Sequence, residues 1–370
     1  MPHGESEDLT DHYCGELRKR LKKGFGEISA VVMPDFFLDR LISIDSDLET
    51  FSKNLENVAH KKGGSIDGIA QTELRGGNAI NTASALAALG VKVIPIVCTD
   101  KLGSQLIRFY LDFSKIDFSH IKIVREASIT TAIETKTESG RVNIMLRNVG
   151  SLADFGPKHL EDKDYEAMEN ADYVCVFNWA GTRRFGTELA ETVFQQVKKK
   201  GRGKTYCDTA DPTPNRHNIP RLIKNVLQGR HLDILSLNEN EAVCYATELG
   251  YDLKSKEKKM KLEELAKESA KFLAARLSAR IDLHTTEFSA TFTGKDETVI
   301  RSFRVPVLRA TGAGDAWNAG NILGDALQLS PECRLTLANA VASYYMSNPN
   351  GMHPSLRQLV DFCGKLEKRA

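Results

Sequence analysis

A run of small residues that ends in an acid carries the clearest chemistry in the sequence: residues 310–320 read ATGAGDAWNAG. Gly312, Ala313 and Gly314 let the backbone N–H groups of a turn approach an oxyanion, and the helix that follows adds the positive end of its dipole. Asp315 then falls in the first helical turn. Because a carboxylate repels phosphate, we interpret Asp315 as a general base for a hydroxyl nucleophile. The alternative is that Asp315 only caps the helix and the small residues allow tight packing.

A second segment, Gly76-Gly77-Asn78 with Asn81 one helical turn later, stands near the front of the chain. Adjacent glycines before a helix permit positive φ, and Asn78 is a good helix cap. Asn78 and Asn81 share a helix face, where their amides could bind sugar hydroxyls. Taken alone, the segment is more typical of a purely structural helix start than of a binding site. Asp208 and Asp211 also follow a strand-like run, but an Asp-Pro turn explains them equally well.

Apolar, β-rich runs alternate with helical patterns along most of the chain. We expect strands at 28–33, 91–97, 171–177, 204–208, 232–237, 280–285 and 289–293, and helices at 78–89, 186–200, 257–279, 313–327 and 332–346. Such runs suit strands buried on both faces. The repetition predicts right-handed crossovers and an α/β fold: a doubly wound three-layer α/β/α sandwich with a mostly parallel central sheet.

Two stretches break this rhythm and predict a small accessory sheet. Residues 41–75 are polar with short apolar patches, and 121–150 contain alternating strand-like segments that turn at 138–140. We assign both stretches to a β lid over an active site. Residues 28–40, 76–120 and 151–370 then form the nucleotide- and substrate-binding domain, and residues 1–27, with a basic helical pattern at 12–24, form an N-terminal helical extension.

Composition excludes several classes of protein. Fifty Lys and Arg against 49 Asp and Glu leave a net charge of +1, so we expect no nucleic-acid partner. The seven cysteines are scattered without a C-x-x-C pair, which predicts reduced core thiols, a cytoplasmic location and no zinc site. The polar start and the lack of any apolar stretch of about 18 residues predict that the protein is not exported and has no membrane contact.

Taken together, the two segments resemble the signatures of the ribokinase, or PfkB, family of carbohydrate and nucleoside kinases, over roughly residues 28–366. Weaker matches agree with this. Asp35 and Asp39 resemble the family's acids for substrate hydroxyls, 238–241 (NENE) resembles its magnesium-site motif, and Thr130-Thr131 followed by the Gly140 turn resembles its lid strand.

The resemblance implies a phosphotransferase in which Asp315 is the base and the amides of Gly312, Ala313 and Gly314 neutralise charge on the transferred group. It implies ATP as phosphoryl donor and Mg²⁺ held by Glu241 with help from Asn238. The implied acceptor-binding residues are Asp35, Asp39, Gly76, Gly77, Asn78, Asn81 and Arg183. The implied nucleotide-binding residues are Asn238, Thr285, Thr286, Thr311, Gly312, Gly314 and Asn339.

The chain also departs from the family's pattern. Arg309 and Ala310 replace an acid and a threonine, which puts activation by a monovalent cation in doubt. The stretch 284–290 lacks both glycines of the family's nucleotide-pocket turn, so ADP stays open as an alternative donor. A lone His284 there is interpreted as a wall or core residue rather than a catalyst.

The basic residues near the predicted site bear on the class of acceptor. We expect a free sugar or nucleoside, but Arg147, Arg183 and Arg184 could clamp a phosphate, so a sugar phosphate such as ribose 1-phosphate is an alternative. A non-catalytic sugar or nucleotide sensor is a second alternative, and an NAD-linked oxidoreductase a third, which the lack of a G-x-G-x-x-G fingerprint disfavours. Lid strands with exposed edges predict a possible homodimer in such a family.

Overall fold

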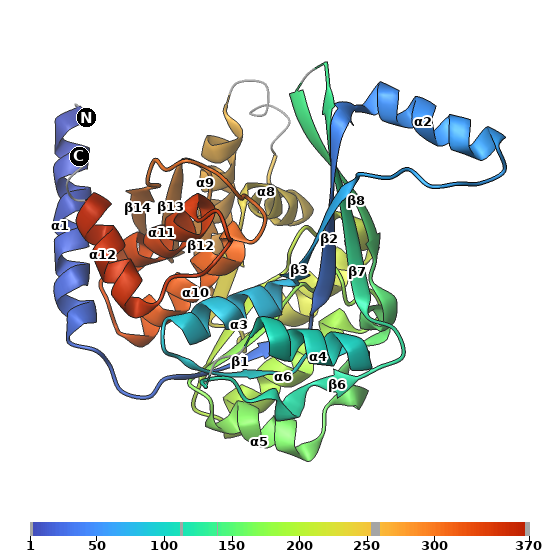
Figure 1. The fold of residues 1–370 in the computed structure, drawn as a ribbon. Helices are drawn as coiled ribbons and strands as arrows, with labels where there is room; N and C mark the ends of the chain where they lie inside the picture. Colours follow the sequence, from blue (N-terminus) through green and yellow to red (C-terminus); the bar gives the residue numbers. More distant parts are fainter. Residues whose placement is uncertain (1–2, 112–113, 139, 253–259, 367–370) are drawn as a thin grey trace.

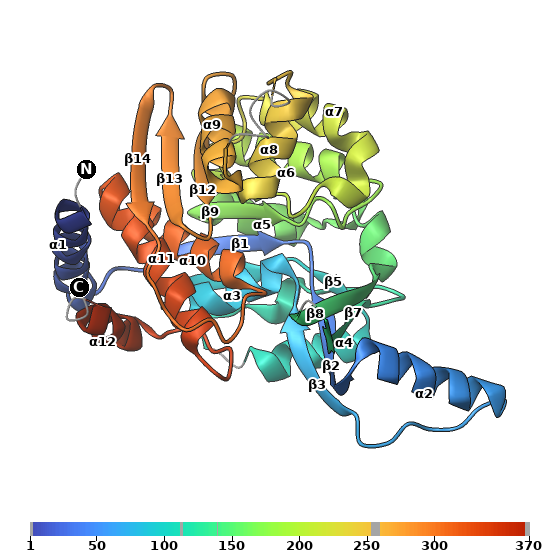
Figure 2. The same ribbon diagram turned by 90° about the horizontal axis from the view of Figure 1, so that it is seen from above.

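A twisted eight-stranded sheet crosses the molecule, and helices cover both of its faces (Figures 1 and 2). We obtained this arrangement as a computed structural model, which describes residues 3–111, 114–138, 140–252 and 260–366. From edge to edge the strands are β14 (Asp296–Arg301), β13 (Phe288–Thr293), β12 (Arg280–His284), β11 (Ile234–Leu237), β10 (Lys204–Asp208), β9 (Tyr173–Phe177), β1 (Ser29–Met33) and β4 (Lys92–Pro95). The strands from β12 to β4 pair in parallel, whereas β13 and β14 are antiparallel. The predicted mostly parallel sandwich is confirmed.

Apolar side chains on both faces of each strand explain why helices cover both faces of the sheet. Val31 and Met33 point into one core and Ala30 and Val32 into the other, because successive side chains of a strand face opposite ways. The first core is closed by α5 (Asp162–Asn170), α6 (Gly186–Lys200), α7 (Ile219–Leu222), α8 (Glu239–Glu248) and α9 (Leu262–Ala274). The second is closed by α3 (Asn78–Ala88), α4 (Lys101–Tyr110), α10 (Ala313–Ala326), α11 (Pro331–Ser347) and α12 (Leu356–Leu366).

Most predicted elements lie within a few residues of the observed ones, with two differences in the main domain. The helix expected at 257–279 is observed as α9, and residues 257–259 lie outside the described residues. The apolar run at 299–308 is also typical of a strand, but β14 ends at Arg301 and residues 302–308 form an irregular connection to the start of α10. Pro306 lacks the N–H that a ladder needs.

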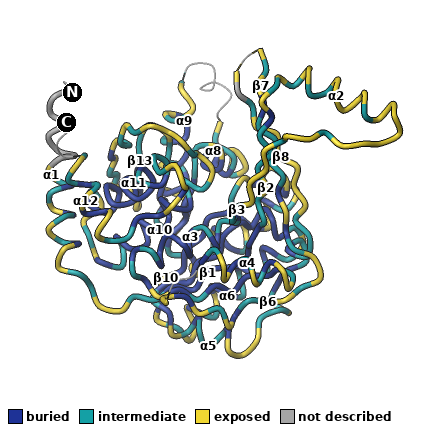
Figure 3. Tube along the Cα trace, viewed as in Figure 1, coloured by how far each residue is buried: buried dark blue, intermediate teal, exposed yellow. Residues whose placement is uncertain are grey.

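The accessory sheet contains four strands in the order β3 (Ala70–Gly76), β2 (Phe37–Asp47), β7 (Ser128–Thr137) and β8 (Gly140–Asn148). It differs from the expected lid because β2 already begins at Phe37 and because β6 (Lys122–Ile123) pairs with β5 (Cys98–Thr99) instead. Residues 48–60 form a helix, α2 (Leu48–His60), which projects from the body and buries no residue (Figures 1 and 3). The oxygen of Asp47 caps it by accepting from Thr50 N at 2.7 Å.

The N-terminal segment packs onto the domain instead of standing apart. The helix α1 (His3–Lys22) lies against α11 and α12, and the two chain ends lie on the same side of the molecule (Figure 1). Leu17 and Leu21 are buried in this contact. Among the described residues, no helix has the length and apolar character needed to cross a membrane. All seven cysteines lie in the described part of the chain, and none of them forms a disulfide.

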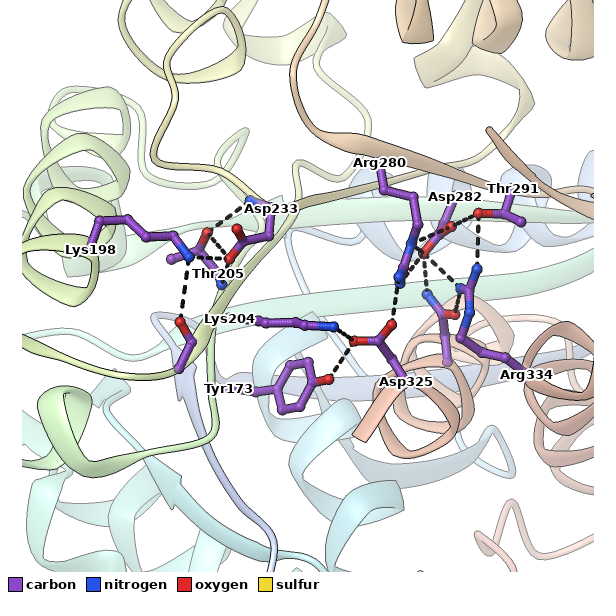
Figure 4. Close-up of polar contacts among 12 residues, drawn as sticks. Tyr173, Lys198, Lys204, Thr205, Asp233, Arg280, Asp282, Thr291, Asp325 and Arg334 are labelled. Atoms are coloured by element: carbon purple, nitrogen blue, oxygen red, sulfur yellow. Dashed lines mark hydrogen bonds and ion pairs between the residues drawn. The ribbon is translucent and has the colours of Figure 1, made fainter. Parts of the chain in front are cut away.

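A buried ionic network ties the strands to α10 and α11 at some distance from the sheet's carboxyl edge (Figure 4). Asp282 on β12 accepts from Arg334 Nη1 at 3.0 Å and from Arg280 Nη2 at 2.9 Å. Asp325 accepts from Arg280, from Lys204 and from Tyr173. Burial opposes ionisation of Asp282, but the two guanidinium groups outweigh it and hold its pKa below the ordinary range.

We predict that Asp282→Asn lowers the free energy of unfolding by about 3–5 kcal/mol at pH 7, because two partly or fully buried guanidinium groups lose their shared counter-ion. A folded-state pKa below the unfolded one, which is about 3.9, stabilises the fold only above that value. The difference between wild type and variant in urea unfolding should therefore shrink as the pH falls below about 4. Glu49→Gln, which breaks the exposed ion pair with Lys53, is the control and should leave the free energy of unfolding unchanged. An equally small effect of Asp282→Asn would contradict this account.

Candidate active site

The sheet changes direction of winding between β1 and β9, and polar residues gather at the carboxyl ends of these strands. From β1 the chain continues to β4 on one side, and β9, β10, β11 and β12 follow on the other. Such a switch point leaves a crevice outside the strand ends where ligands bind in open α/β sheets. Asp35 follows β1 and Asn178 follows β9, and Asn178 Nδ2 donates to Asp35 Oδ2 at 2.7 Å.

Asp35 fixes the start of α3. The N-cap of this helix, Gly77, has no side chain to offer, so the first helical N–H groups take their acceptor from another segment. Asn78 N and Ala79 N both donate to the Asp35 carboxylate at 2.9 Å. Gly77 has a φ of 94°, and a Cβ there would lie 2.9 Å from Asp35 O. Burial raises the pKa of Asp35, and these donors oppose that shift.

The helix α3 then meets α10 through one carboxylate. Asn78 Nδ2 donates to Asp315 Oδ1 at 2.8 Å, and Asn81 Nδ2 donates to Asp315 Oδ2 at 2.9 Å. Asp315 lies in the first turn of α10 and is 5% exposed. The amides expected to bind sugar hydroxyls therefore hold the expected base, one on each oxygen. Burial raises the pKa of Asp315 well above its ordinary value, and the nearby Asp208 and Asp35 raise it further.

Residues 312–314, the N-cap and first two residues of α10, are named the anion turn below. Gly312 is left-handed, with a φ of 89°, and a Cβ there would lie 2.7 Å from the hydroxyl oxygen of Tyr345. Tyr345 in turn donates to Thr311 O at 2.8 Å. Ala313 N donates to Ala310 O at 3.1 Å, whereas the N–H groups of Gly312 and Gly314 have no acceptor in the described part of the chain. In this conformation two of the three expected amides are free to bind an anion.

Asp39 lies on β2 of the accessory sheet and faces the same crevice. Burial raises its pKa to about 6, and a hydrogen bond from Thr130 opposes the shift. A Cβ at Gly76 would lie 2.1 Å from Asp39 Oδ2, so any larger residue at position 76 would displace this carboxylate. The carboxylate of Asp35 accepts from the first N–H groups of α3. In the described chain, no helix N-terminus donates in this way to the carboxylate of Asp39.

Two buried carboxyl groups lie together at the ends of β10 and β11. Glu241 accepts from Asn238 N at 3.0 Å and from Asn238 Nδ2 at 2.8 Å, in the capping box of α8. Asp208 accepts from Ala210 N and from Asn318 Nδ2. Burial raises the pKa of both, and their mutual repulsion raises that of Glu241 further. Within the described ranges neither pairs with a cation. Oxygen ligands of this kind suit Mg²⁺, so the residues present fit the ion that the family pattern implies.

The other residues expected to contact nucleotide differ in availability. Thr285 Oγ1 closes the turn after β12 by donating to Phe288 O, and Thr286 N donates to Glu239 Oε1 at 2.8 Å. Thr311 is exposed at the anion turn. Asn339 is a core residue: its oxygen accepts from Trp317 Nε1 and its amide donates to Arg301 O. Asn339 is only 3% exposed, and a contact between Asn339 and a nucleotide stays a prediction.

His284 lies beside the anion turn as a wall residue. Its ring is 5.0 Å from that of Trp317, and a Cβ at Gly314 would come within 3.1 Å of its Cε1. Burial lowers the pKa of His284 to about 4, so the ring is neutral at physiological pH. The guanidinium of Arg309 lies against Gly351, where a Cβ would come within 2.7 Å of its Cζ.

The three arginines considered as phosphate ligands divide into two groups. Arg184 is exposed and pairs with Asp154 at 2.7 Å, which uses its charge at the surface. Arg183 lies half-buried after β9, close enough to Arg147 on β8 that each repels the other's charge. Asn178, which sequence analysis missed, has a φ of 47° and turns the chain between β9 and Arg183. Its only signal was an Asn directly after a buried strand.

Solved structures of kinases share the fold of this chain. Ribokinase from Thermotoga maritima superposes with a TM-score of 0.66 at 16% identity, over 92% of this chain and 100% of the other. Ribokinase from Arabidopsis thaliana, complexed with ribose and ATP, gives 0.66 at 19% identity, over 92% and 99%. Ribokinase from Cryptococcus neoformans, in complex with ADP, gives 0.68 at 15% identity, over 94% and 100%. The fold is therefore ribokinase-like.

The family is shown by a sequence model. The pfkB family carbohydrate kinase model matches residues 39–358, so the chain belongs to this family, as the two segments predicted. The protein is accordingly a carbohydrate or nucleoside kinase. No curated protein sequence matches it.

We predict that Gly312→Ala lowers kcat by about 10²-fold or more, the usual effect of losing one preorganised donor to an oxyanion. The added methyl group would meet Tyr345 and a left-handed backbone, so the anion turn must shift. Steady-state kinetics with any accepted substrate measures the effect. Gly26→Ala, where no atom lies within 4 Å of the new Cβ, is the control. An unchanged kcat for Gly312→Ala would remove the anion turn from the mechanism.

For Gly76→Ala we expect a rise in acceptor KM of about 10- to 100-fold with little change in kcat, because the methyl group displaces the Asp39 carboxylate from its hydrogen-bonding position. The carboxylate is the flexible end of a side chain, so the melting temperature should hardly move. Asp39→Asn should act in the same direction. If both variants keep the wild-type KM, Asp39 does not bind the acceptor.

Proposed function

We propose that this kinase transfers the terminal phosphoryl group of a Mg²⁺–nucleotide to a hydroxyl group of a sugar or nucleoside, with Asp315 as general base. The observation that carries the proposal is the Asp315 carboxylate itself, buried in the crevice between two amides and directly beside the anion turn. A carboxylate without a catalytic task would be costly at this position, because it is desolvated and has no cationic partner in the described residues.

The chemistry follows from the positions of these groups. The acceptor hydroxyl gives its proton to Asp315, its oxygen bonds to the terminal phosphorus, and the bond from phosphorus to the bridging oxygen of the nucleotide breaks. The free N–H groups of Gly312 and Gly314 donate to the oxygens of the transferred group, where negative charge is concentrated. Each such donor is worth about 3–4 kcal/mol of barrier. Asn78 and Asn81 keep the carboxylate oriented, so they act on kcat as well as on acceptor affinity.

Glu241 and Asp208 are the residues that would hold Mg²⁺, with Asn238 positioning Glu241. When bound, the ion would supply charge neutralisation for the nucleotide phosphates. We take ATP as the donor, with ADP as the alternative because the turn after β12 lacks glycine. Thr285, Thr286 and Thr311 are the threonines expected at the nucleotide site, and Thr286 and Thr311 are exposed.

The accessory sheet is proposed to act as a lid. Its residue Asp39 faces the crevice, while Ile129, Ile144 and Leu146 on the opposite face are 41%, 38% and 57% exposed. Closure of the lid would keep water from the phosphoryl group and so limit nucleotide hydrolysis. The exposed apolar face supports the expected homodimer through lid strands. A cytoplasmic location stays part of the proposal, as does the absence of a nucleic-acid partner.

The decisive variant is Asp315→Asn. We predict a loss of about 10²- to 10⁴-fold in kcat with each accepted substrate, in assays that pair ATP or ADP with sugars, nucleosides and sugar phosphates. Because burial raises the pKa of Asp315, ionising it costs the folded state stability, so Asn should not lower the melting temperature at pH 8. For the same reason, wild-type kcat/KM should fall with decreasing pH well above the ordinary aspartate pKa.

Two outcomes would contradict the proposal. Asp117→Asn, at an exposed site on the far side of the domain, is the control and should keep full activity. If Asp315→Asn phosphorylates as fast as this control, Asp315 is not the base. If the wild type binds ligands but turns over none of them, the protein is a sensor that retains the pocket without the chemistry.

A further inference from the structure

Arg183 lies beside the crevice, and part of its guanidinium group has no hydrogen-bond partner in the described chain. It follows Asn178, the residue that bonds Asp35, and it is half-buried. Its Nη1 is shielded from solvent and has no hydrogen-bond partner in the described part of the chain. Burial, and then the charge of Arg147, lowers the pKa of this guanidinium. A buried donor without an acceptor is costly, so its retention indicates an acceptor that arrives from outside.

Arg147 reaches the same place from the accessory sheet. Asp39 on β2 pairs in register with Thr130 on β7, which pairs with Arg147 on β8. Residues in register share a sheet face, so these three side chains form one row on the crevice side, with Arg147 about 10 Å from Asp39 at two strand spacings. The Arg147 guanidinium carbon lies 5.3 Å from the ring centroid of Phe37. No ion pair joins Arg147 or Arg183 to a carboxylate among the described residues.

Neighbouring arginines show the ordinary arrangement. Arg184 pairs with Asp154, Arg216 with Glu248 and Arg221 with Glu188, each at the surface. Arg147 and Arg183 instead lie within electrostatic range of each other, and neither forms an ion pair in the described chain, although the charge of Arg147 also acts on Asp35 and Asp39. Two guanidinium groups that converge without an ion pair are a typical dianion site, since each presents a planar fork of donors that matches phosphate oxygens.

The order of groups along the crevice gives the ligand its direction. Asp315 and the anion turn lie at one end, where the reacting hydroxyl and the nucleotide phosphates are placed by the proposed function. Asp35 and Asp39, which suit further hydroxyls, come next, and both sense the charge of Arg147. The arginine pair therefore lies on the acceptor side, separated from the nucleotide phosphates by the acceptor itself.

We propose that Arg147 and Arg183 bind a phosphate group on the acceptor, so that the preferred substrate of this kinase is a sugar monophosphate and the product carries two phosphates. This inference rests on the proposed function for its orientation, but the anion site itself is defined by the two arginines. It replaces the pair expected from sequence, Arg183 with Arg184, because Arg184 is already neutralised by Asp154.

The test compares sugars and sugar monophosphates as matched pairs: a pentose with its 1- and 5-phosphates, and a hexose with its 6-phosphate. For wild type we expect kcat/KM to be at least 10-fold higher for one phosphorylated member than for its free sugar. Arg183→Met and Arg147→Met, which keep side-chain length, should each raise the KM for that substrate by about 10- to 100-fold and leave kcat nearly unchanged. Arg184→Met is the matched control and should keep the wild-type KM.

Calorimetric binding separates failure of this inference from failure of the proposed function. Wild type should bind the sugar monophosphate at least 10-fold more tightly than the free sugar, and Arg183→Met should lose that preference, whether or not turnover occurs. Equal affinity for both members, or an Arg183→Met protein of wild-type melting temperature that keeps the preference, would overturn the anion site and leave the kinase proposal intact. Tighter binding of sugar carboxylates than of sugar phosphates would also overturn the proposed phosphate site. A protein that shows the phosphate preference without turnover would contradict the proposed function alone.

Discussion

The geometry of this site depends on one buried carboxylate, each oxygen of which accepts a hydrogen bond from a side-chain amide. Asp315 belongs to α10 near the end of the chain, and its donors Asn78 and Asn81 belong to α3, 237 and 234 residues earlier. A desolvated carboxylate at this position is tolerable only if donors are already in place. Those donors exist only if α3 begins at Asn78, which requires the positive φ of Gly77 and the carboxylate of Asp35. The site is thus a series of dependent contacts rather than a set of independent residues.

The same edge of the sheet concentrates acidic groups. Asp35, Asp39, Asp208, Glu241 and Asp315 all have raised pKa values, in each case chiefly because of burial. Burial therefore disfavours the ionised form of each of these acids at this edge. A divalent cation at Asp208 and Glu241 would favour their ionised forms, so metal binding is expected to release protons and to shift the charge balance around Asp315. Arg147 and Arg183 provide the opposite charge at the acceptor end of the crevice.

Much of the fold could be predicted from periodicity, because strands buried on both faces and helices with apolar stripes leave strong patterns. The two motif segments predicted the helices α3 and α10 and a kinase active site built from both. The family match supports the class of carbohydrate or nucleoside kinases. The helix α2 was missed because its polar residues suggested a lid strand, although Asp47 and the spacing of Leu48, Phe51, Leu55 and Val58 are helical. The use of Asn78 and Asn81 as ligands of Asp315 could not be predicted, since it depends on how two distant helices cross. The core partners of Asn339, Trp317 and Arg301, could not be predicted either, because they come from other elements.

The central claim is that Asp315 takes the proton of the acceptor hydroxyl while the anion turn holds the phosphoryl group. A crystal structure of the protein with Mg²⁺, a non-hydrolysable nucleotide and its best acceptor tests this claim most directly. The account predicts a hydroxyl oxygen of the acceptor within hydrogen-bonding distance of the Asp315 carboxylate, in line with the terminal phosphorus, and phosphate oxygens on the N–H groups of Gly312 and Gly314. A hydroxyl directed away from Asp315, or a terminal phosphate bound elsewhere than the anion turn, would contradict it.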